Sequence, residues 1–197
     1  MQALNEAAFS QPHWLLRAKG FNTEDWYGRP QRGTAMERNG GIENPNRTRL
    51  YTRNCVYYRF ADSNARSDDA KQGGGWWLDY EQLEKVMSGC AATGMNLSQM
   101  ARHYLAVPWE WSQADIVISA VFQQPMDAYE GRGRPVEITG RYLGRNAVDA
   151  GQGYSGNRNV IQLFVPDMRS HWRQTLTMVK VEDVRVFARQ HRDIIRV

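Results

Sequence analysis

The stretch "KQGGGWWLDYEQLEKV", residues 71–86, passes from three glycines to two tryptophans and then to a helical pattern. Asp79 is a favourable N-cap and Gln82 follows three residues later, which is the spacing of a capping box. If the preceding residues are extended, Trp76 and Trp77 point to opposite faces. We expect one indole in the core and the other lining a groove, where bare glycines admit a ligand or another strand. The alternative is that both indoles belong to the core.

The pattern after Asp79 predicts two consecutive helices. Leu83, Val86 and Met87 share one helical face, and Gly89 is a plausible C-terminal stop. A second helix is predicted from about residue 96 to about residue 106, where a nearby proline ends it. Both helices therefore precede the run of strand-like segments that begins at residue 115.

The segments around these helices have the composition of strands. They are rich in aromatic and β-branched residues and are separated by Gly- and Pro-containing loops such as "EGRGRP" and "DAGQGYSGNRN". One strand, two helices and then a run of strands predict an α+β protein. We expect a mainly antiparallel, split β-sheet, with the helices segregated in the N-terminal half. The predicted strands are residues 50–60, 115–124, 135–143, 159–166 and 176–187.

Residues 1–50 differ in character from the rest of the chain. They are polar and rich in Gly, Asn and Arg, and residues 27–49 contain so many turn formers that they predict a loop. We therefore expect residues 1–50 to be a polar N-terminal extension that packs on a domain formed by residues 51–197.

The overall composition sets weak limits on function. The 197 residues carry a net charge of +4, which mildly favours an acidic partner, but basic and acidic residues are interspersed without a Lys/Arg block. No apolar run approaches the ~20 residues of a membrane span, and the N-terminus lacks the basic and apolar regions of a secretory signal. We expect a soluble protein that is cytoplasmic, or that reaches a target cell's cytoplasm by a signal-peptide-independent route, with no membrane partner.

The sequence lacks the common catalytic and metal-binding motifs. Cys55 and Cys90 have no metal-binding spacing, the four histidines show no zinc pattern, and no metal is expected. The cysteines are interpreted as two buried free thiols, with one disulfide as the alternative. The P-loop, the dinucleotide-binding glycine motif and the nucleophile elbow are all missing.

Three local features could carry chemistry. Arg59 ends the aromatic strand "VYYRF", where a guanidinium can present its fork to phosphate; the alternative is an ordinary surface arginine. The "GGGWWLD" stretch offers a flat apolar wall suited to an aromatic ring. In residues 153–167 a loop with an apparently exposed Tyr154 leads into an apolar strand that contains Gln162, which needs hydrogen-bond partners if it is buried.

In this order, the three features resemble the ADP-ribosyltransferase fold of bacterial toxins and effectors. That family has an Arg on an early strand, a Ser-Thr-Ser strand leading into a helix, a loop with an aromatic residue, and a strand with a catalytic Glu. "YYRF" resembles the first motif and "GGGWWLDYEQLEKV" stands at the second. "GYSGNRN" resembles the loop, and "VIQLFVP" the catalytic strand. The correspondence spans residues 55–187.

The resemblance implies a set of site residues. Arg59 and Gln162 would be catalytic. NAD, as co-substrate, would contact Arg59, Phe60, Gly75, Trp76 and Trp77, and the acceptor would contact Tyr154, Ser155 and Asn157. Gly74 to Trp77 replace Ser-Thr-Ser, and Gln162 replaces the Glu whose charge would stabilise an oxocarbenium-like transition state. Alternative acids are Glu182, Asp183 and Glu137.

The function implied is NAD-dependent mono-ADP-ribosylation of a macromolecule, a protein rather than a nucleic acid, by an effector or toxin with a possible neutralising immunity protein. Three alternatives stay open. They are an NAD glycohydrolase, a catalytically degenerate module that binds NAD or a protein, and a nucleic-acid-binding protein or nuclease.

Overall fold

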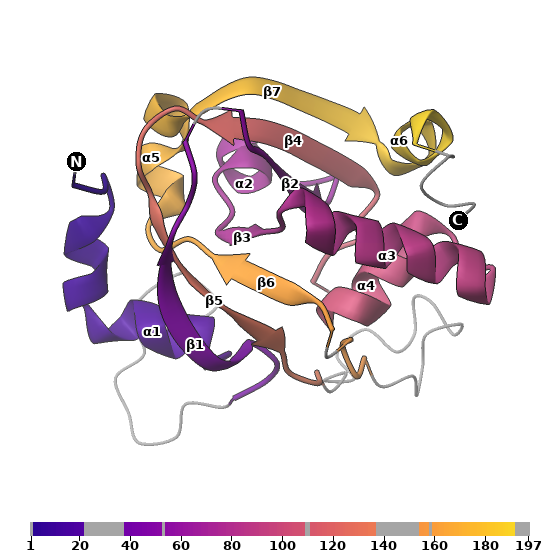
Figure 1. Ribbon diagram of the computed structural model, residues 1–197, viewed down its shortest axis with the longest axis horizontal. Coiled ribbons are helices and arrows are strands. Elements are labelled where there is room, and N and C mark those ends of the chain that lie inside the picture. The colour runs from indigo at the N-terminus through magenta and orange to yellow at the C-terminus, as the bar shows by residue number, and fades with distance from the viewer. Residues whose placement is uncertain are drawn as a thin grey trace.

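The computed structural model describes residues 2–21, 38–52, 54–108, 111–136, 154–157 and 159–191. The described residues form an α+β fold with two antiparallel sheets, of strand order β1-β5-β6-β3 and β2-β4-β7 (Figure 1). The strands are β1 (Ile42–Arg49), β2 (Val56–Ala61), β3 (Trp76–Trp77), β4 (Ile116–Phe122), β5 (Asp127–Gly133), β6 (Ile161–Phe164) and β7 (Leu176–Asp183). The helices are η1 (Glu6–Ser10), α1 (Pro12–Ala18), α2 (Asp68–Gln72), α3 (Tyr80–Thr93), α4 (Leu97–Leu105), α5 (Met168–Thr175) and α6 (Val184–Gln190).

Within the part of the chain that the structure describes, one backbone bridge connects the two sheets. Tyr58 of β2 and Leu78, which follows β3, exchange two backbone hydrogen bonds of 2.8 Å. On its other side β3 pairs with β6, where Trp77 lies opposite Leu163. The strands therefore continue as one split sheet in which β2 and β6 flank the short β3.

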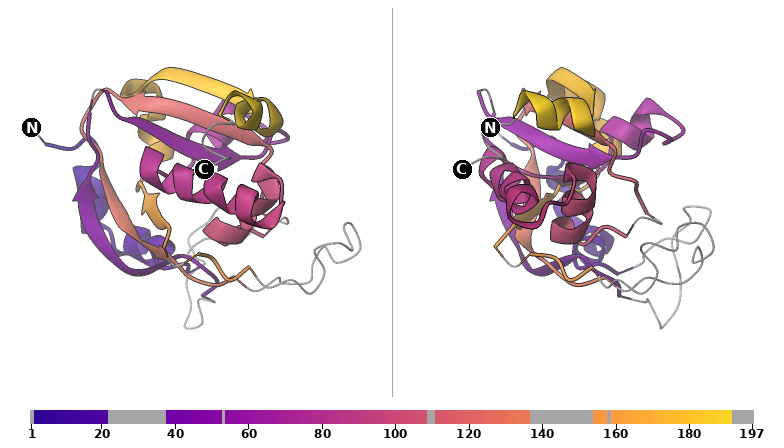
Figure 2. Two further views of the ribbon diagram at one scale, coloured as in Figure 1. Left: turned by 45° about the vertical axis from the view of Figure 1, so that its right-hand side comes forward. Right: turned by 90° about the vertical axis from the view of Figure 1, so that its right-hand side faces the viewer.

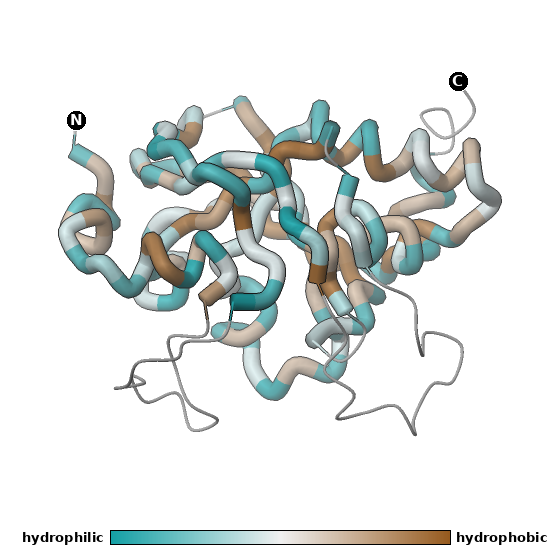
Figure 3. The backbone as a smooth tube through the Cα atoms, turned by 90° about the horizontal axis from the view of Figure 1, so that it is seen from below, coloured by the Kyte–Doolittle hydropathy of each residue, from teal (hydrophilic) through white to brown (hydrophobic). Residues whose placement is uncertain are grey.

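Three apolar layers hold the fold together. The central cluster draws residues from both sheets, including Trp77, Phe122 and Leu163. A second cluster joins α3, α4 and α6 to β2 and β4, and a third joins α1 to β1, β5 and β6 (Figures 1 and 2). In the view from below, hydrophobic and hydrophilic residues alternate along much of the chain, as expected where each element buries one face (Figure 3).

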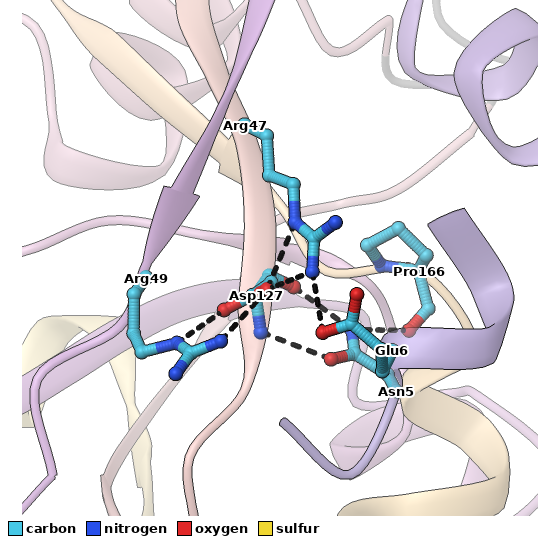
Figure 4. Close-up of polar contacts among 6 residues, drawn as sticks. All are labelled: Asn5, Glu6, Arg47, Arg49, Asp127 and Pro166. Atoms are coloured by element: carbon cyan, nitrogen blue, oxygen red, sulfur yellow. Dashed lines mark hydrogen bonds and ion pairs between the residues drawn. The ribbon is translucent and has the colours of Figure 1, made fainter. Parts of the chain in front are cut away.

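The N-terminal segment is fastened to the sheet by a buried asparagine. The Asn5 side chain is buried, and its amide nitrogen donates to the carbonyl oxygens of Asp127 (2.8 Å) and Pro166 (3.1 Å). Its amide oxygen accepts from the backbone nitrogen of Asp127 at 2.9 Å (Figure 4). A side chain before η1 thus completes the hydrogen bonding of residues on β5 and after β6.

The Asp127 carboxylate lies beneath two arginines of the edge strand β1. Its side chain is 3% exposed; Arg47 Nε donates to it at 2.9 Å and Arg49 Nε at 2.6 Å. Arg47 also pairs with Glu6 at 2.6 Å (Figure 4). The Arg47 guanidinium lies over the Phe9 ring. Burial by itself would raise the pKa of Asp127, but the hydrogen bonds from Arg49 and Arg47 outweigh burial and hold this pKa below its usual value.

The two predicted helix starts, at the Asp79 cap and at about residue 96, are confirmed. The Asp79 side chain accepts from the Gln82 backbone nitrogen, and Asn96 and Gln99 form a complete capping box at α4. The predicted stop at Gly89 is wrong, because α3 continues to a left-handed Gly94. Gly89 instead lets α4 approach, since a Cβ atom there would lie 2.7 Å from the Tyr104 ring.

Other boundaries differ from the prediction. The loop predicted over residues 27–49 is wrong where β1 forms, and β5 occupies residues that include part of the predicted "EGRGRP" loop. The predicted strand 176–187 divides into β7 and α6, and α5 precedes it, so the helices are not confined to the N-terminal half. Strands β4 and β6 confirm the predictions around them, whereas most of the predicted strand 135–143 lies outside the described residues.

Two further expectations concern the cysteines and the membrane. Both cysteines are free, and Cys90 is buried as expected, but Cys55 is exposed. Among the described residues no helix is long and apolar enough to cross a membrane.

Candidate functional site

Arg59 is a half-buried cation held by backbone oxygens. Its Nε donates to the Lys71 carbonyl oxygen at 2.9 Å and its Nη1 to the Trp76 carbonyl oxygen at 3.3 Å. No carboxylate of the described residues forms an ion pair with it, and burial lowers its pKa to about 10. A guanidinium with unsatisfied charge and spare N–H donors is suited to an anionic ligand.

The three glycines are needed for contacts within the protein itself. A Cβ atom on Gly74 would lie 1.9 Å from the Arg59 guanidinium carbon, and one on Gly73 would lie 2.5 Å from the Asp69 carbonyl oxygen. A Cβ atom on Gly75 would lie 2.8 Å from the carbonyl oxygen of Val165. Protein groups therefore fill this space. Of the two predicted occupants, a ligand or another strand, the structure shows the strand at Gly75, whose carbonyl oxygen accepts from the Val165 nitrogen after β6 at 2.7 Å.

The two tryptophans point to opposite faces, as predicted. Trp77 is 1% exposed, packs edge-on against Phe122 at 5.5 Å between ring centroids, and donates from Nε1 to the Gly74 carbonyl oxygen at 2.9 Å. Trp76 is half-buried and packs on Phe164 at 4.9 Å, in the layer covered by α1. Phe60 is also half-buried and packs against the α3–α4–α6 layer.

Gln162 is buried and its amide is already used. Its Nε2 donates to the Leu105 carbonyl oxygen at 3.1 Å, and Gly133 lies so close that a Cβ atom there would be 2.3 Å from Nε2. The neighbouring Ile161 nitrogen donates to the side chain of Gln82 at 2.9 Å, which fixes the start of β6 against α3. These contacts satisfy the requirement that a buried Gln find partners.

The predicted recognition loop lies against the C-terminal end of α4. Tyr154 is 1% exposed and its ring packs on His103, so the expectation of an exposed aromatic is wrong. Tyr154 forms a backbone bridge with Val136, and this pairing holds the tyrosine in a buried position. Ser155 is exposed, and the Asn157 nitrogen donates to the Tyr104 carbonyl oxygen at 2.9 Å.

The structure forms two groups from the predicted residues. Arg59 lies with Gly75, Trp76 and the α2 end, whereas Gln162, Tyr154 and Asn157 gather around the end of α4. Strand alternation separates the groups further. Arg59 shares the face of Tyr57 and Ala61, which belong to the central cluster with Leu163, and Gln162, next to Leu163, points the other way.

An acidic residue that the sequence analysis did not suggest lies on the same face of the split sheet as Arg59. Glu130 of β5 is paired with Leu163, and Leu163 with Trp77, so the three side chains lie in one row with Arg59 on the next strand. Glu130 is half-buried and has no hydrogen-bond or ion-pair partner in the described ranges. It was missed because "EGRGRP", which begins with Glu130, was interpreted as a loop.

None of the three acids that were predicted as alternatives to a catalytic Glu is found beside Arg59 among the described residues. Asp183 caps α6, accepting from the backbone nitrogens of Arg185 at 2.8 Å and Val186 at 3.3 Å. Glu182 lies on β7 opposite Val117, on the face that α3, α4 and α6 cover. Glu137 lies outside the described residues.

Comparisons of the chain with family models, curated proteins and solved structures find no match in any of the three. The described residues contain no cluster of three or more His, Cys, Asp or Glu that could hold a metal ion.

Proposed function

We propose that the protein is an NAD-dependent mono-ADP-ribosyltransferase, an effector or toxin that transfers ADP-ribose from NAD to a macromolecular acceptor. The observation that carries the proposal is Arg59, a half-buried guanidinium that contacts carbonyl oxygens and no carboxylate of the described residues. In the proposed complex its free donors bind the diphosphate of NAD.

The arrangement of strands supports the proposal. The resemblance implies that the Arg strand, the strand before the helix and the catalytic strand work together. In the fold, β3 leads into α3 and lies between β2, which bears Arg59, and β6, which bears Gln162. This adjacency is compatible with a site that three separate sequence motifs would build.

Cleaving the bond between nicotinamide and ribose develops positive charge on the sugar, which a nearby carboxylate would stabilise. Gln162 lacks that charge and its amide donates to Leu105. Glu130 shares the face of Arg59, three strand spacings away, or roughly 14 Å between backbones. The Trp77 and Leu163 side chains between them in that row are buried in the central cluster, so Glu130 does not share an open site with Arg59. We assign the stabilising carboxylate to no described residue and give Gln162 a positioning role at β6.

One observation favours a second function, a degenerate module that binds NAD or a protein without turnover. The Gln162 side chain is buried and donates to the Leu105 carbonyl oxygen inside the protein, as that of a residue released from catalysis would. Titration of NAD separates the two functions, because a binding module takes up NAD and releases no nicotinamide.

The proposal is tested by incubating the protein with labelled NAD and a cell lysate. We expect a labelled macromolecule and released nicotinamide. Replacing Arg59 with Gln should lower the rate about 100-fold, because a charge-assisted contact with the NAD diphosphate is lost, and Arg185→Gln, at an exposed helix position, serves as the matched control. Gln162→Ala and Glu182→Gln tested in parallel identify which side chain supplies the effect.

Three outcomes separate the alternatives. Nicotinamide release without a labelled acceptor identifies an NAD glycohydrolase. NAD binding without nicotinamide release identifies the binding module. If NAD neither binds nor turns over, the proposal fails.

Gly74→Ala should weaken NAD binding through Arg59. The new methyl group would occupy the guanidinium position, and the flexible Arg59 side chain would have to move away. Loss of a charge-assisted hydrogen bond predicts roughly 10- to 100-fold weaker binding, matching Arg59→Gln. Gly74→Ala should lower the free energy of unfolding by only about 1 kcal/mol. Gly94→Ala should lower it by a similar amount, because it puts a side chain at a left-handed position with open space around it.

Titration calorimetry and chemical denaturation of both variants give the comparison. If Gly94→Ala weakens NAD binding as much as Gly74→Ala does, the effect is on general stability and Arg59 has no special role.

A further inference from the structure

Two arginines lie together where β5 ends and the chain enters β1. Arg38 forms a backbone bridge with Phe21, and the Arg134 nitrogen donates to the Gly41 carbonyl oxygen at 2.8 Å. These bonds bring two residues 96 positions apart in sequence to one corner of the sheet β1-β5-β6-β3. The corner is separate from Arg59, whose contacts are with Lys71, Gly74 and Trp76.

Neither arginine has its charge neutralised by a direct ion pair among the described residues. Arg38 Nε donates to the Lys19 carbonyl oxygen at 2.8 Å, and its guanidinium lies 5.2 Å from the centre of the Phe21 ring. The Nε atom of Arg134 is buried without a hydrogen-bond partner. Burial, followed by the charge of Arg134, lowers the pKa of Arg38; nearby Glu43 opposes this shift but does not cancel it. The corner therefore keeps excess positive charge.

An exposed indole borders the same corner. Trp111 is 51% exposed, and a Cβ atom on Gly40 would lie 3.9 Å from its ring edge. Gly40 lies two residues after Arg38 and next to Gly41, which accepts the Arg134 hydrogen bond. A large aromatic surface that could have been buried thus stays in water beside two cations.

From this juxtaposition we propose that Trp111, Arg38 and Arg134 form a nucleotide-binding site. The base stacks on the exposed face of Trp111, and the phosphate accepts hydrogen bonds from the Arg38 and Arg134 guanidinium groups. The proposal is independent of NAD turnover, because it uses none of the residues assigned to that reaction.

The combination of groups favours a nucleotide over an acidic peptide. Two guanidinium groups alone would accept either ligand. An aspartate or glutamate side chain, however, has no ring to cover the indole, whereas every base has one. Glu43 repels any anion and limits the affinity, so the stacking contact is needed for binding. The same nucleotide chemistry occurs in a free nucleotide and in a single strand.

The test uses the full chain and fluorescence anisotropy of a labelled ten-nucleotide single-stranded DNA, with AMP as competitor. Trp111→Ala should weaken binding about 5- to 100-fold, in line with the loss of one stacked base. Arg134→Gln should weaken binding and also reduce the dependence on salt by about one phosphate contact. Arg185→Ala, which replaces an exposed arginine on α6, should leave binding unchanged.

The possible outcomes differ in meaning. Competition by AMP supports the site with a free nucleotide as ligand, and binding of the strand without competition by AMP supports it with a nucleic acid. If neither probe binds, or if Trp111→Ala and Arg134→Gln bind like the wild type, the proposal is overturned. Binding of an acidic ten-residue peptide in preference to both probes overturns it as well. Thermal unfolding confirms that each variant is folded.

Discussion

Asp127→Asn is expected to lower the free energy of unfolding by roughly 2–4 kcal/mol. The carboxylate is 3% exposed and accepts from Arg47 and Arg49. An amide there would turn N–H donors toward two guanidinium groups and remove the buried negative charge that both of them contact. Loss of one partner in a buried ion pair typically costs about 3–5 kcal/mol. The expected loss is smaller because the arginine side chains are 40% and 48% exposed and can be hydrated in part.

Urea denaturation measures this loss, and Glu6→Gln is the matched control. Glu6 pairs with the same Arg47, but its side chain is 36% exposed, so its replacement should cost less than about 1 kcal/mol. Equal losses in the two variants would show that the burial of Asp127 does not determine its contribution.

The same contacts predict the pH dependence of stability. Because the pKa of Asp127 is lower in the folded protein than in the unfolded chain, its contribution is fully present above the unfolded pKa. The contribution disappears as the pH falls through the folded pKa. The difference in unfolding free energy between the wild type and Asp127→Asn should therefore be constant near neutral pH and shrink below about pH 4. A difference that grows in acid would contradict this assignment.

Trp77→Ala should cost about 3–5 kcal/mol, the range for removing a large aromatic side chain from a core. Trp77 lies in the central cluster, which joins the two sheets, and contacts Phe122. Its replacement would leave a cavity and remove the hydrogen bond from Nε1 to the Gly74 carbonyl oxygen. Both changes affect the point where β3 passes into α3.

Trp76→Ala gives the internal comparison, because it is the adjacent residue with the same side chain. Trp76 is only half-buried against Phe164, so the expected loss is about 1–2 kcal/mol. Chemical denaturation of the two variants under identical conditions decides the point. If Trp76→Ala is as destabilising as Trp77→Ala, the two faces of β3 contribute equally and the central cluster has no special role.

Local signals made the helices around Trp77 predictable. Asp79 and Asn96 cap helices through their own nearest neighbours in sequence, so the capping residues could be identified without knowledge of the fold. The opposite directions of Trp76 and Trp77 followed from the alternation of an extended chain. Such features depend on a few consecutive residues, which is why they were predicted correctly.

Predictions failed where contacts with a segment far away in sequence determine the local structure or the exposure of a residue. Strand β1 has the composition of a loop because it lies at a sheet edge, contains Pro45 and a left-handed Asn44, and exposes most of its residues. Gly89 looked like a helix stop, yet its lack of a side chain serves the packing of α4. Tyr154 looked exposed, yet its pairing with Val136 buries it.

The sequence by itself determined the α+β class, the two capped helices and the opposite faces of the two tryptophans, because short-range hydrogen bonding and side-chain alternation control these features. Only the tertiary structure decided what the glycines before the tryptophans do. In the folded protein the Arg59 guanidinium lies against Gly74, and Trp111 lies next to Gly40. Glu130 is paired with Leu163 across two neighbouring strands. Contacts between segments far apart in sequence depend on strand order and register, and no local pattern in this chain specifies either.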